Sequence, residues 1–205
     1  MSSRKIGVGG RILEAIEESP SGIASLDVLK SLRLTDSSTL KTILSRLNQS
    51  GRIIRLKRGV YSSKPIRDAY CCAQALFNGY VGFAGALHVH KIIAEIPFMV
   101  VVVTPATSKT RVFNNFEFKA VALKEKAIGF ERVGNYVVST RAKTLFDCLY
   151  LPDYSIEMEK LCSAFAQAGL SKKEWVEFEY YVENFARGKA RERMLKIERK
   201  IKSGF

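Results

Sequence analysis

DSSTLKTILSRLNQSGRIIRLKRGVY, residues 36–61, is the stretch that decides the fold of the first part of the chain. Its first half carries apolar residues at helical spacing, which places them on one buried stripe: Leu40, Ile43, Leu44 and Leu47. Asp36 or Thr35 can supply the side-chain oxygen that caps the start of this helix. Gly51 stands where a left-handed residue is needed to end it. The pattern therefore predicts a helix between these limits.

The opposite face of this helix is polar or basic, with no acidic residue after Asp36: Ser37, Ser38, Thr39, Lys41, Thr42, Ser45 and Arg46. The strand and turn that follow carry four more cations: Arg52, Arg55, Lys57 and Arg58. Gly59 completes the turn, and the return strand begins at residue 60. The second half of the stretch therefore predicts a β-hairpin with a cationic tip.

Two further helices are expected before this stretch. The first has apolar residues at helical spacing, namely Val8, Ile12, Ala15 and Ile16. Ser25 can cap a second, short helix whose apolar face is formed by Leu26, Leu29 and Leu32. Three helices followed by a basic hairpin are typical of a winged helix-turn-helix, which we expect at about residues 8–64, within a first domain of residues 1–64.

The charge distribution favours a nucleic-acid partner for this domain. Residues 1–64 contain 12 basic and 5 acidic side chains, a net charge of +7, within a chain whose total is +13. A helix fits the major groove of DNA, so a helix with an apolar back and a small polar front can reach base edges. The hairpin cations and the backbone N–H groups at the helix start can contact phosphates. We therefore expect double-stranded DNA as the partner.

The rest of the chain is predicted to be α+β. Residues 65–155 are expected to form a mixed α+β domain with a small sheet: a helix at 68–77, another at 83–93, a strand at 99–103 apolar on both faces, strands around Asn114 and Asn115, and a hairpin around Gly134. A helix capped by Ser139 or Thr140 follows. Residues 156–205 read as C-terminal helices that extend this domain, the last of them basic.

Several other functions are not favoured by the sequence. There is no run of 18 apolar residues and no apolar signal core in residues 1–5, so we expect a cytoplasmic protein with no membrane contact. The four cysteines form no CxxC pair, and His88 and His90 lack a third ligand nearby, so no metal and no cofactor are expected. No phosphate loop or nucleophile signature occurs. We therefore do not expect an enzyme.

Motifs beyond the hairpin resemble the AbiEi-type antitoxins, the transcriptional regulators of type IV toxin–antitoxin systems. Those motifs are the segment 57–61 with Pro65, the segment 85–90 with His88, Ile96 with Pro97, the strand 101–104, Val138 with Ser139, the segment 143–147, and Leu149 with Tyr150. Within 143–147, Lys143 and Asp147 agree with the family motif. Ala142 stands where the family has Glu, and Thr144 stands where it has Ala.

The resemblance covers about residues 8–155 and implies a two-domain autorepressor. The winged helix would bind an operator, for which an inverted repeat is expected. The second domain, marked by His88, Lys143 and Asp147, would antagonise a nucleotidyltransferase-like toxin or protect its target. Monomeric and dimeric states both stay open, as do two other functions: a protein-interaction module, or an antitoxin, that acts without DNA binding, and a metal-dependent nuclease.

Overall fold

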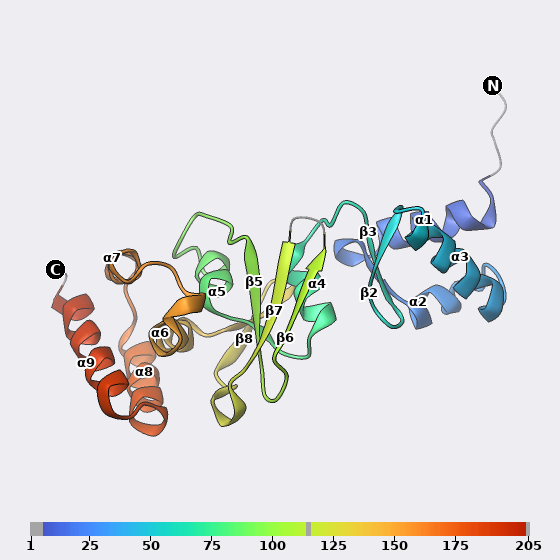
Figure 1. The fold of residues 1–205 in the computed structure, drawn as a ribbon. Coiled ribbons are helices and arrows are strands. Elements are labelled where there is room, and N and C mark those ends of the chain that lie inside the picture. Colours follow the sequence, from blue (N-terminus) through green and yellow to red (C-terminus); the bar gives the residue numbers. More distant parts are fainter. Residues whose placement is uncertain (1–5, 114–115, 204–205) are drawn as a thin grey trace. The chain divides into compact units, whose positions relative to one another are not determined.

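The chain is mixed α+β, with a three-stranded sheet, a six-stranded sheet and a group of C-terminal helices (Figure 1). The computed structural model describes residues 6–113 and 116–203, so residues 1–5 and the pair Asn114–Asn115, around which strands were expected, lie outside the described residues. Two compact units are present, Met1–Leu76 (unit 1) and Phe77–Phe205 (unit 2). The α+β class predicted from the sequence is confirmed.

Unit 1 contains an antiparallel sheet in the order β1-β3-β2, with helices packed against it (Figure 1). The helices are α1 (Val8–Glu18), α2 (Leu26–Ser31), α3 (Ser37–Gln49) and α4 (Ala69–Leu76), with a 3-10 turn at Pro20–Gly22. The strands are β1 (Ile23–Ser25), β2 (Ile53–Lys57) and β3 (Val60–Ser63). The helices and the hairpin agree with the sequence patterns. Strand β1 was not predicted, because three residues are too few to show alternation.

Local hydrogen bonds set where α2 and α3 begin. Asp36, rather than Thr35, caps α3: its Oδ1 accepts from the backbone N–H groups of Ser38 at 2.9 Å and Thr39 at 3.0 Å. The hydroxyl of Ser25 accepts from the N–H of Val28 at 3.2 Å, at the start of α2. These bonds satisfy amides that have no partner inside the helix.

The core of unit 1 joins α1, α2 and α3 to the sheet. It is formed by Ile12, Leu13, Ile16, Ala24, Leu29, Leu40, Leu44, Leu47, Ile53 and Tyr61. The apolar stripe predicted on α3 therefore faces inward, with Ile43 half-buried at its margin. On α2 only Leu29 is buried; Leu32, expected on the same apolar face, is 46 % exposed.

Unit 2 is built on a mixed sheet in the order β6-β7-β5-β4-β9-β8. Its strands are β4 (Tyr80–Val81), β5 (Met99–Thr104), β6 (Lys109–Phe113), β7 (Phe116–Ala122), β8 (Phe130–Val133) and β9 (Tyr136–Ser139). The apolar strand predicted at 99–103 is β5, which pairs with β7 in parallel and with β4 antiparallel. Val100 and Val103 are completely buried, as expected for a strand apolar on both faces.

Five helices complete unit 2 and lie on one side of this sheet (Figure 1). They are α5 (Phe83–Val89), α6 (Arg141–Tyr150), α7 (Met158–Ala168), α8 (Lys172–Phe185) and α9 (Gly188–Ser203), with 3-10 turns at Lys124–Lys126 and Pro152–Tyr154. Thr140 caps α6, accepting from the N–H of Lys143 at 3.2 Å. Helix α5 ends earlier than the predicted residue 93, because the chain turns through a positive φ of 57° at Lys91.

The unit boundary lies later than the predicted boundary at residue 64. Helix α4 packs against β2, and the Lys57 ammonium donates to the carbonyl oxygen of Leu76 at 3.4 Å, which attaches residues 65–76 to unit 1. At the other end, residues 156–205 share the core of unit 2, where Met194 and Ile201 of α9 are buried. Within the described ranges, no helix combines the length and apolar character that crossing a membrane requires.

Candidate nucleic-acid interface

The eleven residues predicted to contact DNA are all exposed in the structure. Seven of them lie on α3, namely Ser37, Ser38, Thr39, Lys41, Thr42, Ser45 and Arg46. Four lie on the hairpin or beside it, namely Arg52, Arg55, Lys57 and Arg58. The buried stripe of α3 points into the core, so its polar face is available to a partner, as the periodicity predicted.

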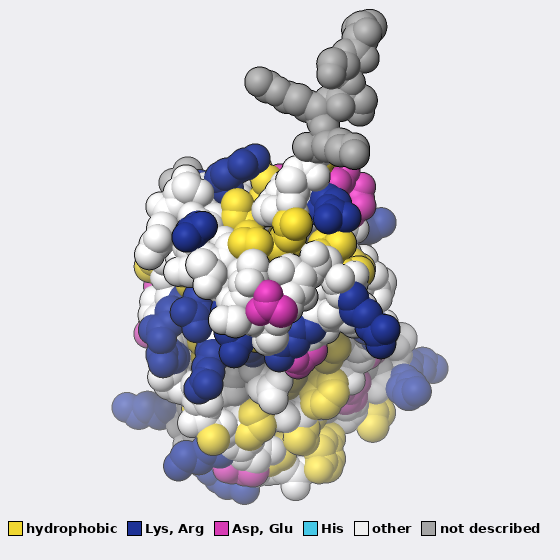
Figure 2. Space-filling model, turned by 90° about the vertical axis from the view of Figure 1, so that its right-hand side faces the viewer, with side chains coloured by type: hydrophobic (Ala, Val, Ile, Leu, Met, Phe, Trp, Pro, Cys, Tyr) yellow, Lys and Arg dark blue, Asp and Glu magenta, His cyan; other side chains and the backbone are white. Residues whose placement is uncertain are grey.

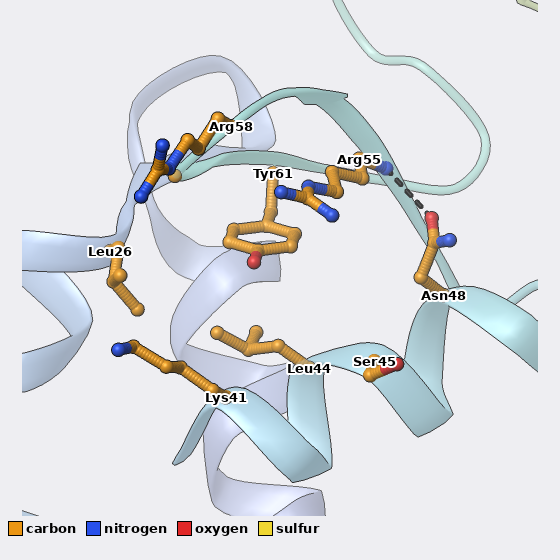
Figure 3. A pocket seen from close by; sticks show the side chains of 9 residues that line it. Leu26, Lys41, Leu44, Ser45, Asn48, Arg55, Arg58 and Tyr61 are labelled. Atoms are coloured by element: carbon orange, nitrogen blue, oxygen red, sulfur yellow. Dashed lines mark hydrogen bonds between the residues drawn. The ribbon is translucent and has the colours of Figure 1, made fainter. Parts of the chain in front are cut away.

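Three of these cations line a single pocket between α3 and the hairpin, which Figure 3 shows from close by. The pocket has a volume of about 300 Å³. Its lining residues are Leu26, Lys41, Leu44, Ser45, Asn48, Arg55, Arg58, Gly59 and Tyr61. Helix α3 and the hairpin therefore present one continuous surface, which sequence patterns alone could not establish.

Two hydrogen bonds hold the hairpin against the helices. Asn48 Oδ1, at the end of α3, accepts from the backbone N–H of Arg55 at 2.8 Å (Figure 3). The backbone N–H of Leu26, at the start of α2, donates to the carbonyl oxygen of Gly59 at 2.7 Å. The strand and the tip are thus each attached to a different helix. Asn48 was missed in the sequence because an amide at the end of a helix has many common roles.

No described residue neutralises the cations of the pocket. The lining includes no Asp or Glu. Among the described residues, the side chains of Lys41, Arg55 and Arg58 make no ion pair and no hydrogen bond. On the face of unit 1 that Figure 2 shows, Lys and Arg side chains outnumber acidic ones. Such a surface attracts an anionic partner.

Lys57 does not belong to this pocket. The hairpin register shifts between Arg55 and Lys57, and the Lys57 ammonium lies instead at the carbonyl of Leu76, the last residue of α4. A cation at a helix C-terminus interacts favourably with the helix dipole. Lys57 therefore has a structural contact that the hairpin pattern did not predict.

The N-terminal amides of α3 are also occupied. The carboxylate of Asp36 accepts from the N–H groups of Ser38 and Thr39, so the expected phosphate contact at the helix start is already taken by a side chain. Hydrogen bonds, those from Thr39 first, lower the pKa of Asp36 below its ordinary value. A negative charge therefore sits at this end of α3 at neutral pH.

In unit 2, Lys143 and Asp147 form an ion pair that is completely buried. The Lys143 Nζ lies 5.9 Å from the ring centre of Tyr80, 5.4 Å from that of Phe146 and 5.7 Å from that of Tyr181. Asp147 Oδ2 has no hydrogen-bond partner among the described residues. Burial raises the pKa of Asp147 to about 6, although Lys143 opposes this, and burial lowers the pKa of Lys143. The pair is a core element rather than an exposed site.

Within residues 6–113 and 116–203, His88 and His90 form no recognisable metal site. His88 is half-buried on α5, and the His90 Nε2 lies 2.7 Å from the carbonyl oxygen of Ser139. No group of three His, Cys, Asp or Glu side chains suited to a metal occurs within the described ranges. The four cysteines form no disulfide, and burial raises the pKa of the Cys72 thiol to about 11.

Comparison with known proteins gives no family for this chain. No protein-family model matches it, and no curated protein sequence matches it significantly. The surface between α3 and the hairpin is therefore the feature of the chain that bears most directly on its function.

Proposed function

We propose that unit 1 is a winged helix-turn-helix that binds double-stranded DNA, and that the chain is a sequence-specific transcriptional regulator. The observation that carries this proposal is the joint surface of α3 and the hairpin, where Lys41, Arg55 and Arg58 line one pocket whose described lining includes no acidic residue. In this arrangement α3 enters the major groove, and its outward hydroxyl, amide and basic groups reach base edges. The hairpin then lies on the adjacent backbone.

Binding of the full chain to a labelled duplex over a range of salt concentrations tests the proposal. The logarithm of the association constant is expected to fall linearly with the logarithm of salt concentration, with a slope of about −0.9 for each phosphate neutralised. Absence of duplex binding at low salt would refute it. Adding magnesium to the same mixture tests the nuclease alternative, which predicts cleavage of the duplex rather than retention alone.

The resemblance to the AbiEi-type antitoxins supports a more specific proposal: the chain represses its own operon and counteracts a nucleotidyltransferase-like toxin. Footprinting on the DNA upstream of its own gene is expected to reveal an inverted repeat. Co-expression with a nucleotidyltransferase encoded next to it is expected to restore growth that the enzyme alone inhibits. Growth that stays inhibited would contradict the antitoxin role and leave the regulator role standing.

Replacing Asp36 by Asn is expected to strengthen duplex binding several-fold. The change removes a negative charge beside the polar face of α3, while Asn caps a helix about as well as Asp. Affinity at fixed salt and thermal stability, measured together, check this prediction. Asp27→Asn, which changes an exposed acid on α2, is the matched control. Equal affinity of the Asp36→Asn variant and the wild type would show that α3 does not approach phosphates at its start.

One observation favours a protein partner as a second candidate function. The loop before β5 exposes Phe98 (90 %) and Ile96 (64 %). Beside it lies a groove of about 510 Å³ with largely apolar walls that include Ile93, Pro97 and Ile156. Phe98→Ser and Ile96→Ser are expected to abolish capture of the co-expressed nucleotidyltransferase while duplex binding stays unchanged. Capture that survives both changes would exclude this surface.

A further inference from the structure

We propose that the pocket between α3 and the hairpin is a specific phosphate-binding site that holds one phosphate group. The hydroxyl of Tyr61 is its central donor. Where the phosphate belongs to a DNA backbone, the inference rests on the proposed function. The same chemistry would serve a free phosphorylated ligand, and the experiments below distinguish the two sources.

The position of Tyr61 is the first evidence that this pocket is a ligand-binding site. Its side chain belongs to the core of unit 1 and is only 7 % exposed. Its hydroxyl nevertheless points into the pocket, among Lys41, Arg55 and Arg58 (Figure 3). Among the described residues this hydroxyl has no hydrogen-bond partner. The oxygen of this hydroxyl is not one of the fully buried, unpartnered polar atoms. It is therefore accessible from the pocket and can donate to an acceptor of a ligand there.

The surrounding charges indicate that this acceptor is anionic. Within the part of the chain that the structure describes, the side chains of Lys41, Arg55 and Arg58 have no partner, and they share the pocket with the Ser45 hydroxyl, which can also donate. Unlike a patch of solvated lysines, these cations come from two elements that are fixed by the bonds at Asn48 and Gly59. An acceptor with several oxygens and a negative charge satisfies all of these donors together.

The size and position of the pocket fit a phosphodiester. Its volume of about 300 Å³ is about ten times the share of one water in the liquid, ~30 Å³, enough for a phosphate with part of its hydration. When α3 occupies the major groove and the hairpin reaches the minor groove, the backbone strand between the two grooves passes over the space between these elements. The pocket then fixes the register of α3 on the duplex.

The first experiment uses inorganic phosphate and the full chain without DNA. Amide chemical shifts are followed as phosphate replaces chloride at constant ionic strength. Saturable shifts are expected at the backbone of Gly59 and at the Asn48 side chain. In Tyr61→Phe, which keeps the ring in the core, phosphate affinity is expected to fall about tenfold, since a hydrogen bond to a charged group is lost. Lys64→Ala, which removes an exposed cation outside the pocket lining, is expected to bind phosphate like the wild type.

The second experiment measures duplex binding of the same variants. Tyr61→Phe is expected to weaken binding about tenfold without a change in the salt slope, because no charge is removed. Lys41→Ala/Arg58→Ala is expected to reduce the slope by about 2. A Tyr61→Phe variant whose thermal stability equals that of the wild type shows that the losses are local.

The outcomes separate the two proposals. If Tyr61→Phe binds both phosphate and duplex with wild-type affinity, the proposed phosphate-binding site is wrong, and DNA binding by unit 1 is left intact. Phosphate binding that depends on Tyr61 in a chain that binds no duplex overturns the DNA function and assigns the pocket to a free phosphorylated ligand. If Tyr61→Phe loses affinity for both phosphate and duplex, the result supports a phosphate-binding site that is part of the DNA interface. If the titration of the wild type with phosphate does not saturate, the proposed phosphate-binding site is also wrong.

Discussion

Lys143→Ala is expected to lower the free energy of unfolding of unit 2 by about 3–5 kcal/mol. Lys143 and Asp147 are both completely buried in the core, one turn apart on α6. Removing the ammonium leaves a carboxylate without a counterion in an apolar environment, where Asp147 Oδ2 already lacks a hydrogen-bond partner within residues 6–113 and 116–203. It also leaves a cavity among the rings of Tyr80, Phe146 and Tyr181.

Urea denaturation followed by tryptophan fluorescence measures this effect in the full chain. Trp175 is the single tryptophan and lies on α8, so its emission reports on unit 2. Lys172→Ala, which changes an exposed lysine of the same helix, is the control and is expected to change stability by no more than about 0.5 kcal/mol.

A second variant keeps the prediction testable if Lys143→Ala fails to fold. Lys143→Met/Asp147→Leu replaces the pair by apolar side chains and is expected to recover most of the stability, because both desolvation costs disappear together. The burial that raises the pKa of Asp147 and lowers the pKa of Lys143 is the physical reason. A loss below about 1 kcal/mol in Lys143→Ala would mean that the pair is solvated.

Replacing four cations of unit 1 together is expected to weaken duplex binding on the order of 10³-fold at ~0.1 M salt. The residues are Lys41, Arg46, Arg55 and Arg58, all exposed. Each phosphate contact releases about 0.9 counterion, which at this salt concentration corresponds to nearly tenfold in affinity. The salt slope of the variant is therefore expected to be about 3 to 4 units shallower than that of the wild type.

Lys57→Ala provides the matched control for this variant. Its ammonium lies at the end of α4, so its removal is expected to change the salt slope by less than 1 unit, the value for one phosphate contact. Fluorescence anisotropy with a labelled duplex, repeated at several salt concentrations, gives both the affinities and the slopes. An unchanged slope in the four-cation variant would exclude α3 and the hairpin as the DNA interface.

Several features of the chain follow from local sequence alone. The apolar spacing at Leu40, Leu44 and Leu47 identifies α3 and its buried face, since a helix repeats every 3.6 residues. Residues 99–103 identify a strand buried on both faces. The polar face of α3 and the cations of the hairpin are likewise visible, because exposure follows from the same periodicity. Gly51 was expected at a left-handed position and has φ +69°.

Tertiary structure alone decides which of these residues act together. The hydroxyl of Tyr61, the amide of Asn48 and three cations meet because β2 and β3 fold back against α3. Lys57 is separated from them by a register shift. Lys143 and Asp147, which the sequence marks only as agreeing with a family motif, form an ion pair that is completely buried. Sequence periodicity assigns a residue to a face of its own element, whereas burial, pairing and unmet hydrogen bonds depend on which other elements cover that face.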